Sequence, residues 1–296
     1  MEDKILDGKL TAKKLKEKLA VHVNSLTAKN INPKLTVILV GDDPASAVYV
    51  RSKENACRKL GMQSQTIRLP EDTSEGALLK CITDLNNDEA NHGILVQLPL
   101  PSHISEEKVI LHIDPVKDVD CFHPQNYGLL AAGNPYVLPC TPAGIIEILK
   151  FYNISTEGKH VVIAGRSNIV GKPMANLLLL KNKFANATVT VVHSRTENLP
   201  FYTQHADIVV AAIGIPNFIT SSHLKEGSVV IDVGINRLDA DNEKGYILAG
   251  DVHFDDVINK VSKITPVPGG VGPMTIAMLM QNTVTAAARQ NGVSIL

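Results

Sequence analysis

Apolar residues along this chain follow two patterns, one typical of helices and one typical of buried strands. Leu15, Leu19, Val23 and Leu26 recur at the spacing of one helix face, which predicts an amphipathic helix. Unbroken apolar runs instead predict strands that are covered on both faces, as in a parallel sheet. The predicted strands are 35–40, 67–69, 93–97, 160–164, 187–193, 207–213 and 228–234.

Predicted helices lie between most of these strands. They are 9–29, 45–60, 74–85, 106–112, 141–152, 174–180 and 274–290. Alternating strands and helices predict the α/β class, with parallel or mostly parallel sheets wound with helices. Pro139 and Pro142 indicate a domain boundary where a new helix begins. We therefore predict two domains with an active-site cleft between them: residues 1–138 together with 275–296, and a Rossmann-type nucleotide domain of residues 139–274.

Composition narrows the class of protein. The 296 residues have a formal net charge of −1 and scattered lysines and arginines, so no basic field for nucleic acid or an anionic membrane is expected. No apolar stretch approaches the ~20 residues of a membrane span, and the first residues lack the basic start and apolar core of a signal peptide. The four cysteines are far apart, without a C-x-x-C pair, which favours reduced thiols in a cytoplasmic protein over disulfides or a metal site.

The most informative stretch is the glycine-containing segment after the predicted strand 160–164. Gly165, Ser167 and Gly171 form the pattern G-x-S-x-x-x-G, and Pro173 then opens a helix. Proline suits a first helical turn, because its missing N–H would have no partner there. A strand, a glycine turn and a helix together point free backbone N–H groups at a phosphate, which favours dinucleotide binding. The spacing departs from G-x-G-x-x-G, so an ordinary turn remains an alternative.

The residues after the next predicted strand indicate which dinucleotide is bound. An NAD site usually has a carboxylate at the end of that strand to hold the ribose hydroxyls. Here Ser194 and Arg195 follow the strand, no acid is present, and Arg166 lies in the glycine turn. A hydroxyl and guanidinium groups suit a 2′-phosphate, so we predict NADP rather than NAD. Taken alone, Arg195 also fits a solvated strand end.

A second group of polar residues is suited to acid–base chemistry. Tyr49 and Lys53 are four residues apart and share one helix face, and Gln97 lies at the carboxyl end of a predicted strand, where α/β sheets bind ligands. Asp118 and Asp120 lie on a loop that can reach the same place. A lysine among apolar and amide groups loses its proton more readily and can then act as an acid or base. On spacing alone, a solvated helix face for Lys53, a core position for Tyr49 and turn positions for the aspartates are the commoner interpretations.

Six segments of the chain occur together in an order that is specific to one family. They are 49–53 (YVRSK), 93–101 (GILVQLPLP), 117–120 (KDVD), 139–142 (PCTP), 165–173 (GRSNIVGKP) and 265–275 (TPVPGGVGPMT). With these segments the chain resembles, over nearly its whole length, the methylenetetrahydrofolate dehydrogenase/methenyltetrahydrofolate cyclohydrolase family in its short bifunctional bacterial form. The resemblance implies oxidation of 5,10-methylene-tetrahydrofolate by NADP⁺, hydrolysis of the product to 10-formyl-tetrahydrofolate, and a homodimer joined through the nucleotide domains.

The resemblance also implies roles for individual residues. Lys53 matches the main cyclohydrolase residue, and Gln97 matches the glutamine that holds and tunes it. Asp120 matches the residue that binds the pterin ring, whose adjacent N–H donors a carboxylate accepts as a pair. The residues implied to bind folate are Tyr49, Pro268, Gly269, Gly270 and Val271. Those implied to bind NADP are Gly165, Arg166, Ser167, Ile169, Gly171, Ser194, Arg195 and Ile235.

One position departs from the family pattern. The family usually has glycine after the second aspartate of K-D-V-D, where this chain has Cys121. If that position requires a positive φ, cysteine strains the backbone beside Asp120. Cys121 is also a candidate for an accessible thiol near the site. Two other functions remain open: an NADP-dependent dehydrogenase for another small acid, and a non-catalytic NADP-binding regulatory protein.

Overall fold

The computed structural model describes residues 2–242 and 245–294, and the chain divides into two units. Unit 1 comprises residues 1–13 and 141–275, and unit 2 comprises residues 14–140 and 276–296. The sequence places the whole of 1–138 in one domain, whereas the structure groups residues 1–13 with unit 1. The reason is local, because the Leu6 N–H donates a 2.8 Å hydrogen bond to the Ile264 carbonyl of unit 1.

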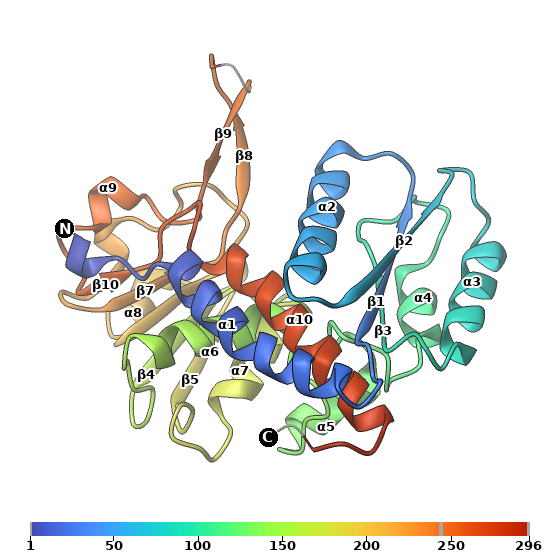
Figure 1. Ribbon diagram of the computed structural model, residues 1–296. Helices are drawn as coiled ribbons and strands as arrows, with labels where there is room; N and C mark the ends of the chain where they lie inside the picture. The colour runs from blue at the N-terminus through green and yellow to red at the C-terminus, as the bar shows by residue number, and fades with distance from the viewer. Residues whose placement is uncertain (1, 243–244, 295–296) are drawn as a thin grey trace. The chain divides into compact units, whose positions relative to one another are not determined.

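A five-stranded parallel sheet forms the centre of unit 1 (Figure 1). Its strand order is β10-β7-β6-β4-β5. The strands are β4 (His160–Ala164), β5 (Thr188–Val192), β6 (Ile208–Ala211), β7 (Val229–Asp232) and β10 (Lys263–Ile264). The predicted α/β class with parallel sheets is confirmed. Because β4 lies between β5 and β6, the direction of winding reverses there, which creates the switch point where such sheets bind ligands.

Helices and a common hydrophobic core complete unit 1. The helices are α6 (Cys140–Phe151), α7 (Gly171–Leu178), α8 (Leu199–Thr203) and α9 (Phe254–Val257), with short 3₁₀ turns η1 (Glu2–Lys4) and η2 (Ser221–His223). Val162, Val209 and Val230 of the sheet pack in one buried cluster with Leu224 and Val257. Burying these side chains stabilises the sheet.

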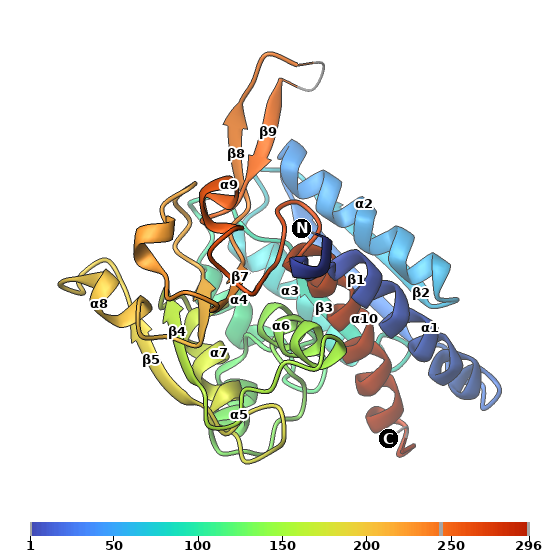
Figure 2. The same ribbon diagram turned by 90° about the vertical axis from the view of Figure 1, so that its left-hand side faces the viewer.

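Unit 1 also contains an antiparallel hairpin that the sequence did not predict. Its strands are β8 (Asn236–Asp239) and β9 (Tyr246–Ala249), with Asn236 opposite Ala249. Figures 1 and 2 show that the hairpin extends away from the parallel sheet of the same unit. The guanidinium of Arg237 lies 4.0 Å from the centre of the Tyr246 ring, a cation–π contact across the two strands.

A smaller parallel sheet, ordered β2-β1-β3, forms the centre of unit 2. Its strands are β1 (Lys34–Val40), β2 (Gln63–Leu69) and β3 (Gly93–Val96). The helices are α1 (Gly8–Thr27), α2 (Pro44–Lys59), α3 (Glu75–Asn87), α4 (Glu106–His112), α5 (Pro124–Ala131) and α10 (Val271–Gln290), of which α1 and α10 have their first residues in unit 1. The core brings Ile38 and Ile94 of the sheet against Leu78, Ile82 and Val109.

Local sequence determines where α2 begins, and so which way its polar residues face. The Asp43 carboxylate accepts the Ser46 N–H at 2.7 Å, and Pro44 occupies the first helical turn. Gly61, with φ of +73°, follows the C-cap residue Leu60, at the position where glycine commonly ends a helix. These signals at both ends fix the helix that carries Tyr49 and Lys53.

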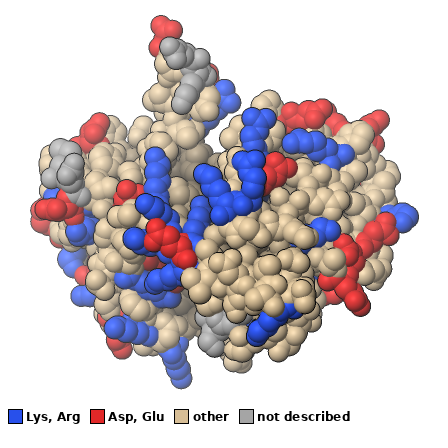
Figure 3. Space-filling view, viewed as in Figure 1, with Lys and Arg blue, Asp and Glu red and all other residues tan. Residues whose placement is uncertain are grey.

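Acidic and basic side chains both occur on the surface of each unit, with broad areas of other residues between them (Figure 3). Among the helices that the structure describes, each is too short or too polar to cross a membrane.

Candidate active site

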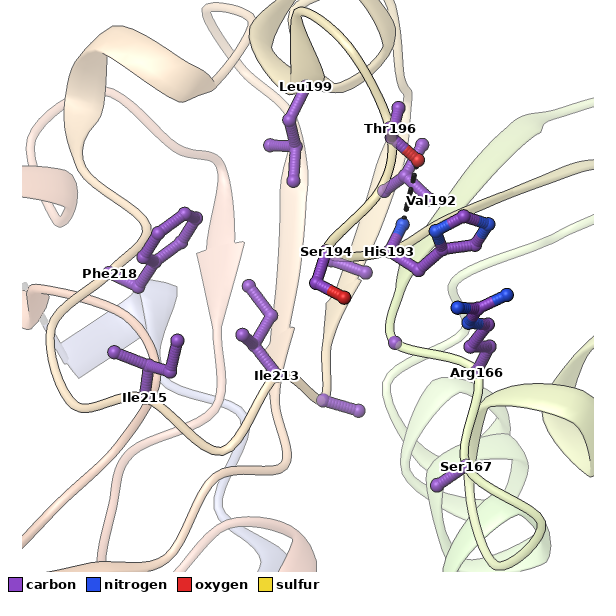
Figure 4. Close-up of a pocket in the computed structure, with 13 residues that line it drawn as sticks. Arg166, Ser167, Val192, His193, Ser194, Thr196, Leu199, Ile213, Ile215 and Phe218 are labelled. Carbon is purple, nitrogen blue, oxygen red and sulfur yellow. Dashed lines mark hydrogen bonds between the residues drawn. The ribbon is translucent and has the colours of Figure 1, made fainter.

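A cavity of about 480 Å³ lies at the carboxyl ends of β4, β5 and β6 in unit 1. Its lining comes from the ends of these strands and the loops that follow them, at the switch point of the sheet (Figure 4). The lining residues are Ala164, Gly165, Arg166, Ser167, Val192, His193, Ser194, Thr196, Leu199, Ala212, Ile213, Ile215 and Phe218. The cavity therefore lies where the sequence predicts the dinucleotide.

Close backbone approach explains both glycines of the turn. Gly165 has φ of +137°, and a Cβ added there would lie 2.1 Å from the Ala212 carbonyl oxygen. A Cβ added at Gly171 would lie 2.2 Å from the Gly165 carbonyl oxygen. No side chain fits at either position, so the loop after β4 stays close both to β6 and to the start of α7.

Ser167 shapes the turn that the glycines permit. Its hydroxyl oxygen accepts the N–H groups of Val170 at 3.1 Å and Gly171 at 3.4 Å. A serine at the place of the second fingerprint glycine therefore organises the entry into α7. The departure from the common spacing has a structural role.

The cavity has a polar side and an apolar side. Figure 4 shows Arg166 and His193 on one side, with Ile215 and Phe218 on the other. His193 lines the cavity, and its Nδ1 accepts the Arg195 N–H at 3.2 Å. Cationic and hydroxyl donors opposite an apolar surface suit a molecule that combines phosphate groups with a flat ring. The strand end at β5 carries Ser194 and Arg195 in place of a carboxylate, which suits the 2′-phosphate of NADP.

The structure separates the predicted cofactor residues into two places. Those that line the 480 Å³ cavity are Gly165, Arg166, Ser167 and Ser194. Those outside its lining are Ile169, Gly171, Arg195 and Ile235. Gly171 is buried behind the turn, and the side chains of Ile169 and Arg195 are exposed. Because strand-end apolar residues look like ordinary core in a sequence, Ile213, Ile215 and Phe218 were not predicted.

A second cavity of unit 1, of about 180 Å³, brings Ile235 together with the predicted folate loop. Its lining residues are Lys9, Asp232, Val233, Gly234, Ile235, Leu248 and 266–273. Gly8 packs tightly on this loop, because a Cβ added there would lie 1.7 Å from the Gly270 carbonyl oxygen. The same close packing brings Lys9, which was not predicted, into the lining.

Lys53 in unit 2 is held by Gln97, as predicted. The Lys53 ammonium donates a 2.9 Å hydrogen bond to Gln97 Oε1. Gln97 Nε2 donates to the Leu98 carbonyl at 2.7 Å, which leaves its oxygen directed at the lysine. Burial lowers the pKa of Lys53, while the negative charge of Asp120 acts in the opposite direction. The interpretation of Lys53 as part of a solvated helix face is therefore wrong.

Asp120 is partly buried, and its charge interacts with that of this lysine. Burial raises the pKa of Asp120, and the charge of Lys53 and a hydrogen bond with the Cys140 thiol oppose that shift. Burial also raises the pKa of Cys140 well above its ordinary value, so the thiol stays neutral. An amine, an amide and a carboxylate are thus gathered within unit 2, and burial shifts the pKa of the amine and of the carboxylate.

The other predicted acid, Asp118, is a loop organiser. Its carboxylate accepts the Phe122 N–H at 3.2 Å, the His123 N–H at 2.9 Å and Asn126 Nδ2 at 2.9 Å. The turn interpretation is therefore correct for Asp118. These bonds fix the segment that immediately follows Asp120.

Unit 2 contains two further residues that bear on the site, Tyr49 and Asn282. Tyr49 is 44% exposed, so it is available to a ligand and is no core residue. Asn282 of α10 was not predicted, and its Nδ2 donates to the Val119 carbonyl at 2.8 Å and the Leu138 carbonyl at 2.7 Å. Asn282 thereby ties together the segments that carry Asp120 and Cys140.

Cys121 occupies the left-handed region that its position was suspected to require. Its φ is +63°, a conformation that costs an L-residue roughly 1–2 kcal/mol. The prediction of an accessible thiol is wrong, because Cys121 is 1% exposed and its Sγ donates to the Val137 carbonyl at 3.5 Å. The side chain packs in the core, and burial raises its pKa.

Replacing Cys121 by glycine is expected to change the free energy of unfolding by less than about 1 kcal/mol, because relief of strain offsets lost packing and added chain entropy. Cys121→Val is expected to lower it by about 2 kcal/mol or more, since a branched residue tolerates positive φ poorly. Urea titration of both variants measures the difference. Equal stabilities would show that φ at this position does not matter.

Comparison with known proteins gives matches over both units. Residues 139–291 match the family model described as tetrahydrofolate dehydrogenase/cyclohydrolase, NAD(P)-binding domain. Residues 6–120 match the model described as tetrahydrofolate dehydrogenase/cyclohydrolase, catalytic domain. Two relatives named bifunctional protein FolD, from Chlorobium chlorochromatii and Acetivibrio thermocellus, are each 56% identical to this chain. The alignments cover 97% and 98% of this chain and 99% of each relative.

This chain is also similar, over nearly its whole length, to solved structures of such enzymes. The bifunctional methylenetetrahydrofolate dehydrogenase/cyclohydrolase FolD of Campylobacter jejuni is 50% identical, with a TM-score of 0.90 over 96% of this chain and 98% of that one. The Trypanosoma brucei enzyme, solved with NADP cofactor and an inhibitor, is 39% identical, with a TM-score of 0.90 over 96% of this chain and 97% of that one.

Proposed function

The chain belongs to the tetrahydrofolate dehydrogenase/cyclohydrolase family, and we propose that Lys53 performs the proton transfers of its hydrolytic reaction. The protein oxidises 5,10-methylene-tetrahydrofolate to the 5,10-methenyl cation with NADP⁺, and hydrolyses this cation to 10-formyl-tetrahydrofolate. The observation that carries the proposal is the partly buried hydrogen bond of 2.9 Å between Lys53 and Gln97. It holds an amine of lowered pKa in one orientation.

The hydrolysis needs a group that takes up and returns a proton. Water attacks the carbon that bridges N5 and N10, and Lys53 in its neutral form accepts a proton from that water. The bond from this carbon to N5 then breaks, N5 receives a proton from the lysine, and the oxygen loses its remaining proton to become the formyl carbonyl. One proton is released overall. Gln97 accepts a hydrogen bond from Lys53 and so keeps its nitrogen in place through both transfers.

Other residues of unit 2 bind the folate in this proposal. Asp120 accepts paired N–H groups of the pterin ring, and its carboxylate also supports the positive charge of Lys53. Tyr49, exposed on the same face of α2, stacks on the ring system. Residues 268–271 of unit 1 stay a predicted contact with the substrate.

We infer that NADP occupies the 480 Å³ cavity of unit 1. When bound, the nicotinamide supplies the hydride acceptor. Arg166, Ser167 and Ser194 line that cavity and offer donors to phosphate, and Gly165 leaves the backbone free of a Cβ at the turn. Roles for Ile169, Gly171, Arg195 and Ile235 stay predictions.

An absorbance assay with 5,10-methylene-tetrahydrofolate tests the function, and NADP⁺ and NAD⁺ are compared in parallel. We expect NADPH to form, with a strong preference for NADP⁺, because guanidinium and hydroxyl groups replace the usual ribose-binding carboxylate. A dehydrogenase for another small acid would give no signal with this folate, and a regulatory protein would bind NADP⁺ without reducing it. Equal use of NAD⁺ would contradict the proposed 2′-phosphate site.

We also propose a homodimer joined through the nucleotide-binding units, in the cytoplasm. Exposed apolar residues of unit 1, such as Ile247 of β9, support an interface there. The four cysteines are free thiols, which suits a reducing compartment. The sedimentation mass of the purified protein distinguishes a dimer from a monomer.

A further inference from the structure

Two buried carboxylates connect the loops beside both cavities of unit 1. Asp251 Oδ2 accepts the N–H groups of Ile213 at 2.6 Å and Gly214 at 2.9 Å, just after β6. Asp251 Oδ1 accepts Asn236 Nδ2 at 3.0 Å, at the start of the β8–β9 hairpin. One side chain thus joins the loop after β6 to the base of the hairpin. Asp251 is 0% exposed, so its carboxylate depends on these protein donors rather than on water.

Asp232, at the end of β7, holds Asp251 in turn. Its carboxylate accepts the N–H groups of Gly234 at 3.0 Å, Asp251 at 2.9 Å and Val252 at 3.0 Å. Its own N–H donates to Thr265 Oγ1 at 2.7 Å, next to the loop that lines the smaller cavity. Burial raises the pKa of Asp232 to about 7, and these three N–H groups oppose the shift. Asp232 and Asp251 together form what we call the carboxylate clasp.

Glycines leave the space that the clasp occupies. A Cβ added at Gly234 would lie 2.2 Å from Asp251 Oδ1, and one added at Gly250 would lie 1.8 Å from Asp232 Oδ2. Neither glycine has a positive φ, so the close approach of the carboxylates explains them. The sequence of this region is therefore adapted to two buried acids that the hydride transfer and the hydrolysis do not use.

We propose that Asp251 is a positioning residue for NADP, which it serves by fixing the loop after β6. That loop supplies Ile213, Ile215 and Phe218, the apolar side of the 480 Å³ cavity. Without an acceptor for its two N–H groups, the loop would lose the bonds that hold it at the edge of the cavity. The inference rests on the proposed occupation of this cavity by NADP.

Asp251→Ala tests the proposal by calorimetric titration with NADP⁺ and by kinetics. We expect the dissociation constant for NADP⁺ to rise about tenfold or more, because two N–H groups of the loop lose their charged acceptor. Cyclohydrolase turnover, measured directly on the methenyl cation without NADP⁺, should stay close to wild type. Asp251→Asn keeps an amide oxygen for the same N–H groups, so we expect a smaller rise, of about two- to fivefold.

Asp207→Ala is the matched control. Asp207 accepts the His160 N–H at 3.0 Å and Lys225 Nζ at 2.8 Å, where β4 and β6 begin, at the opposite end of the same sheet. Asp207→Ala should lower the melting temperature of the protein without changing its affinity for NADP⁺. If Asp251→Ala does not fold, Asp251→Asn is compared with Asp207→Asn in the same way.

The outcomes separate this inference from the proposed function. Wild-type protein that fails to bind NADP⁺ would refute the proposed function. Wild-type protein that binds NADP⁺ while the Asp251 variants bind it equally well would refute only the role of Asp251. A parallel loss of cyclohydrolase turnover, or the same loss of affinity in the Asp207 variant, would show that Asp251 is merely structural.

Discussion

Replacing Lys53 by methionine is expected to lower cyclohydrolase turnover by about 1000-fold, the size of a lost general acid–base group. Methionine keeps an unbranched apolar side chain at this position of α2 but has no amine. Oxidation of the methylene compound transfers a hydride and needs no proton from this lysine, so dehydrogenase turnover should be largely retained. The two rates are measured separately, from loss of the methenyl absorbance and from formation of NADPH.

The pH profile of hydrolysis distinguishes a chemical role from a structural one. If neutral Lys53 accepts a proton from water, the rate rises with pH through the pKa of Lys53, which burial places below its ordinary value. Asp120 raises that pKa, so Asp120→Asn should lower it further and move the rise in rate to lower pH. Turnover at saturating substrate is the quantity to compare, because Asp120 is also proposed to bind the pterin ring.

Lys59→Met is the matched control for Lys53→Met. Lys59 is an exposed lysine in the last turn of the same helix, α2. Its replacement removes an equal charge and should leave both activities unchanged. Hydrolysis that persists in Lys53→Met, or that disappears in both variants, would contradict acid–base catalysis by Lys53.

The sheets could be predicted from the sequence because their strands are nearly continuous apolar runs. β4 and β6 are buried along almost all their length, and Gly165 follows β4 directly, so the order of strand, turn and helix was readable. The β8–β9 hairpin lacks that signal. All residues of β8 and β9 are partly or fully exposed, so no run of buried apolar residues marks these strands in the sequence.

The spacing of residues along the sequence did not reveal which polar side chains become buried when the chain folds. Lys53 stands near Arg51 and Arg58, so its local sequence indicates a solvated helix face. Its hydrogen-bond partner, Gln97, lies 44 residues away, and only the folded sheet brings the two together. The same holds for Asp251, whose partners Ile213 and Gly214 lie 38 and 37 residues away. A carboxylate that accepts backbone N–H groups leaves no periodic pattern in a sequence.

Arg166→Ala is expected to raise the KM for NADP⁺ about 10- to 100-fold, the effect of losing a charge-assisted hydrogen bond to phosphate. Arg166 lines the 480 Å³ cavity on the side opposite Ile215 and Phe218 (Figure 4). NAD⁺ lacks the 2′-phosphate, so its KM should hardly change, and the preference for NADP⁺ should fall by the same factor. Arg195 lies outside the lining of the cavity. Its replacement should therefore raise the KM for NADP⁺ by up to about fivefold, the effect of losing an exposed ion pair.

The comparison of the two coenzymes makes this prediction specific to the 2′-phosphate. Lys181→Ala is the control for a general loss of positive charge, because Lys181 is exposed and follows the end of α7 away from the glycine turn. It should change neither KM. Raising the salt concentration should weaken NADP⁺ binding more in the wild type than in Arg166→Ala, since screening acts on the charge pair that the variant lacks. If Arg166→Ala instead raised the KM for both coenzymes equally, Arg166 would serve a part of the dinucleotide that NAD⁺ and NADP⁺ share, and another group would have to account for the preference.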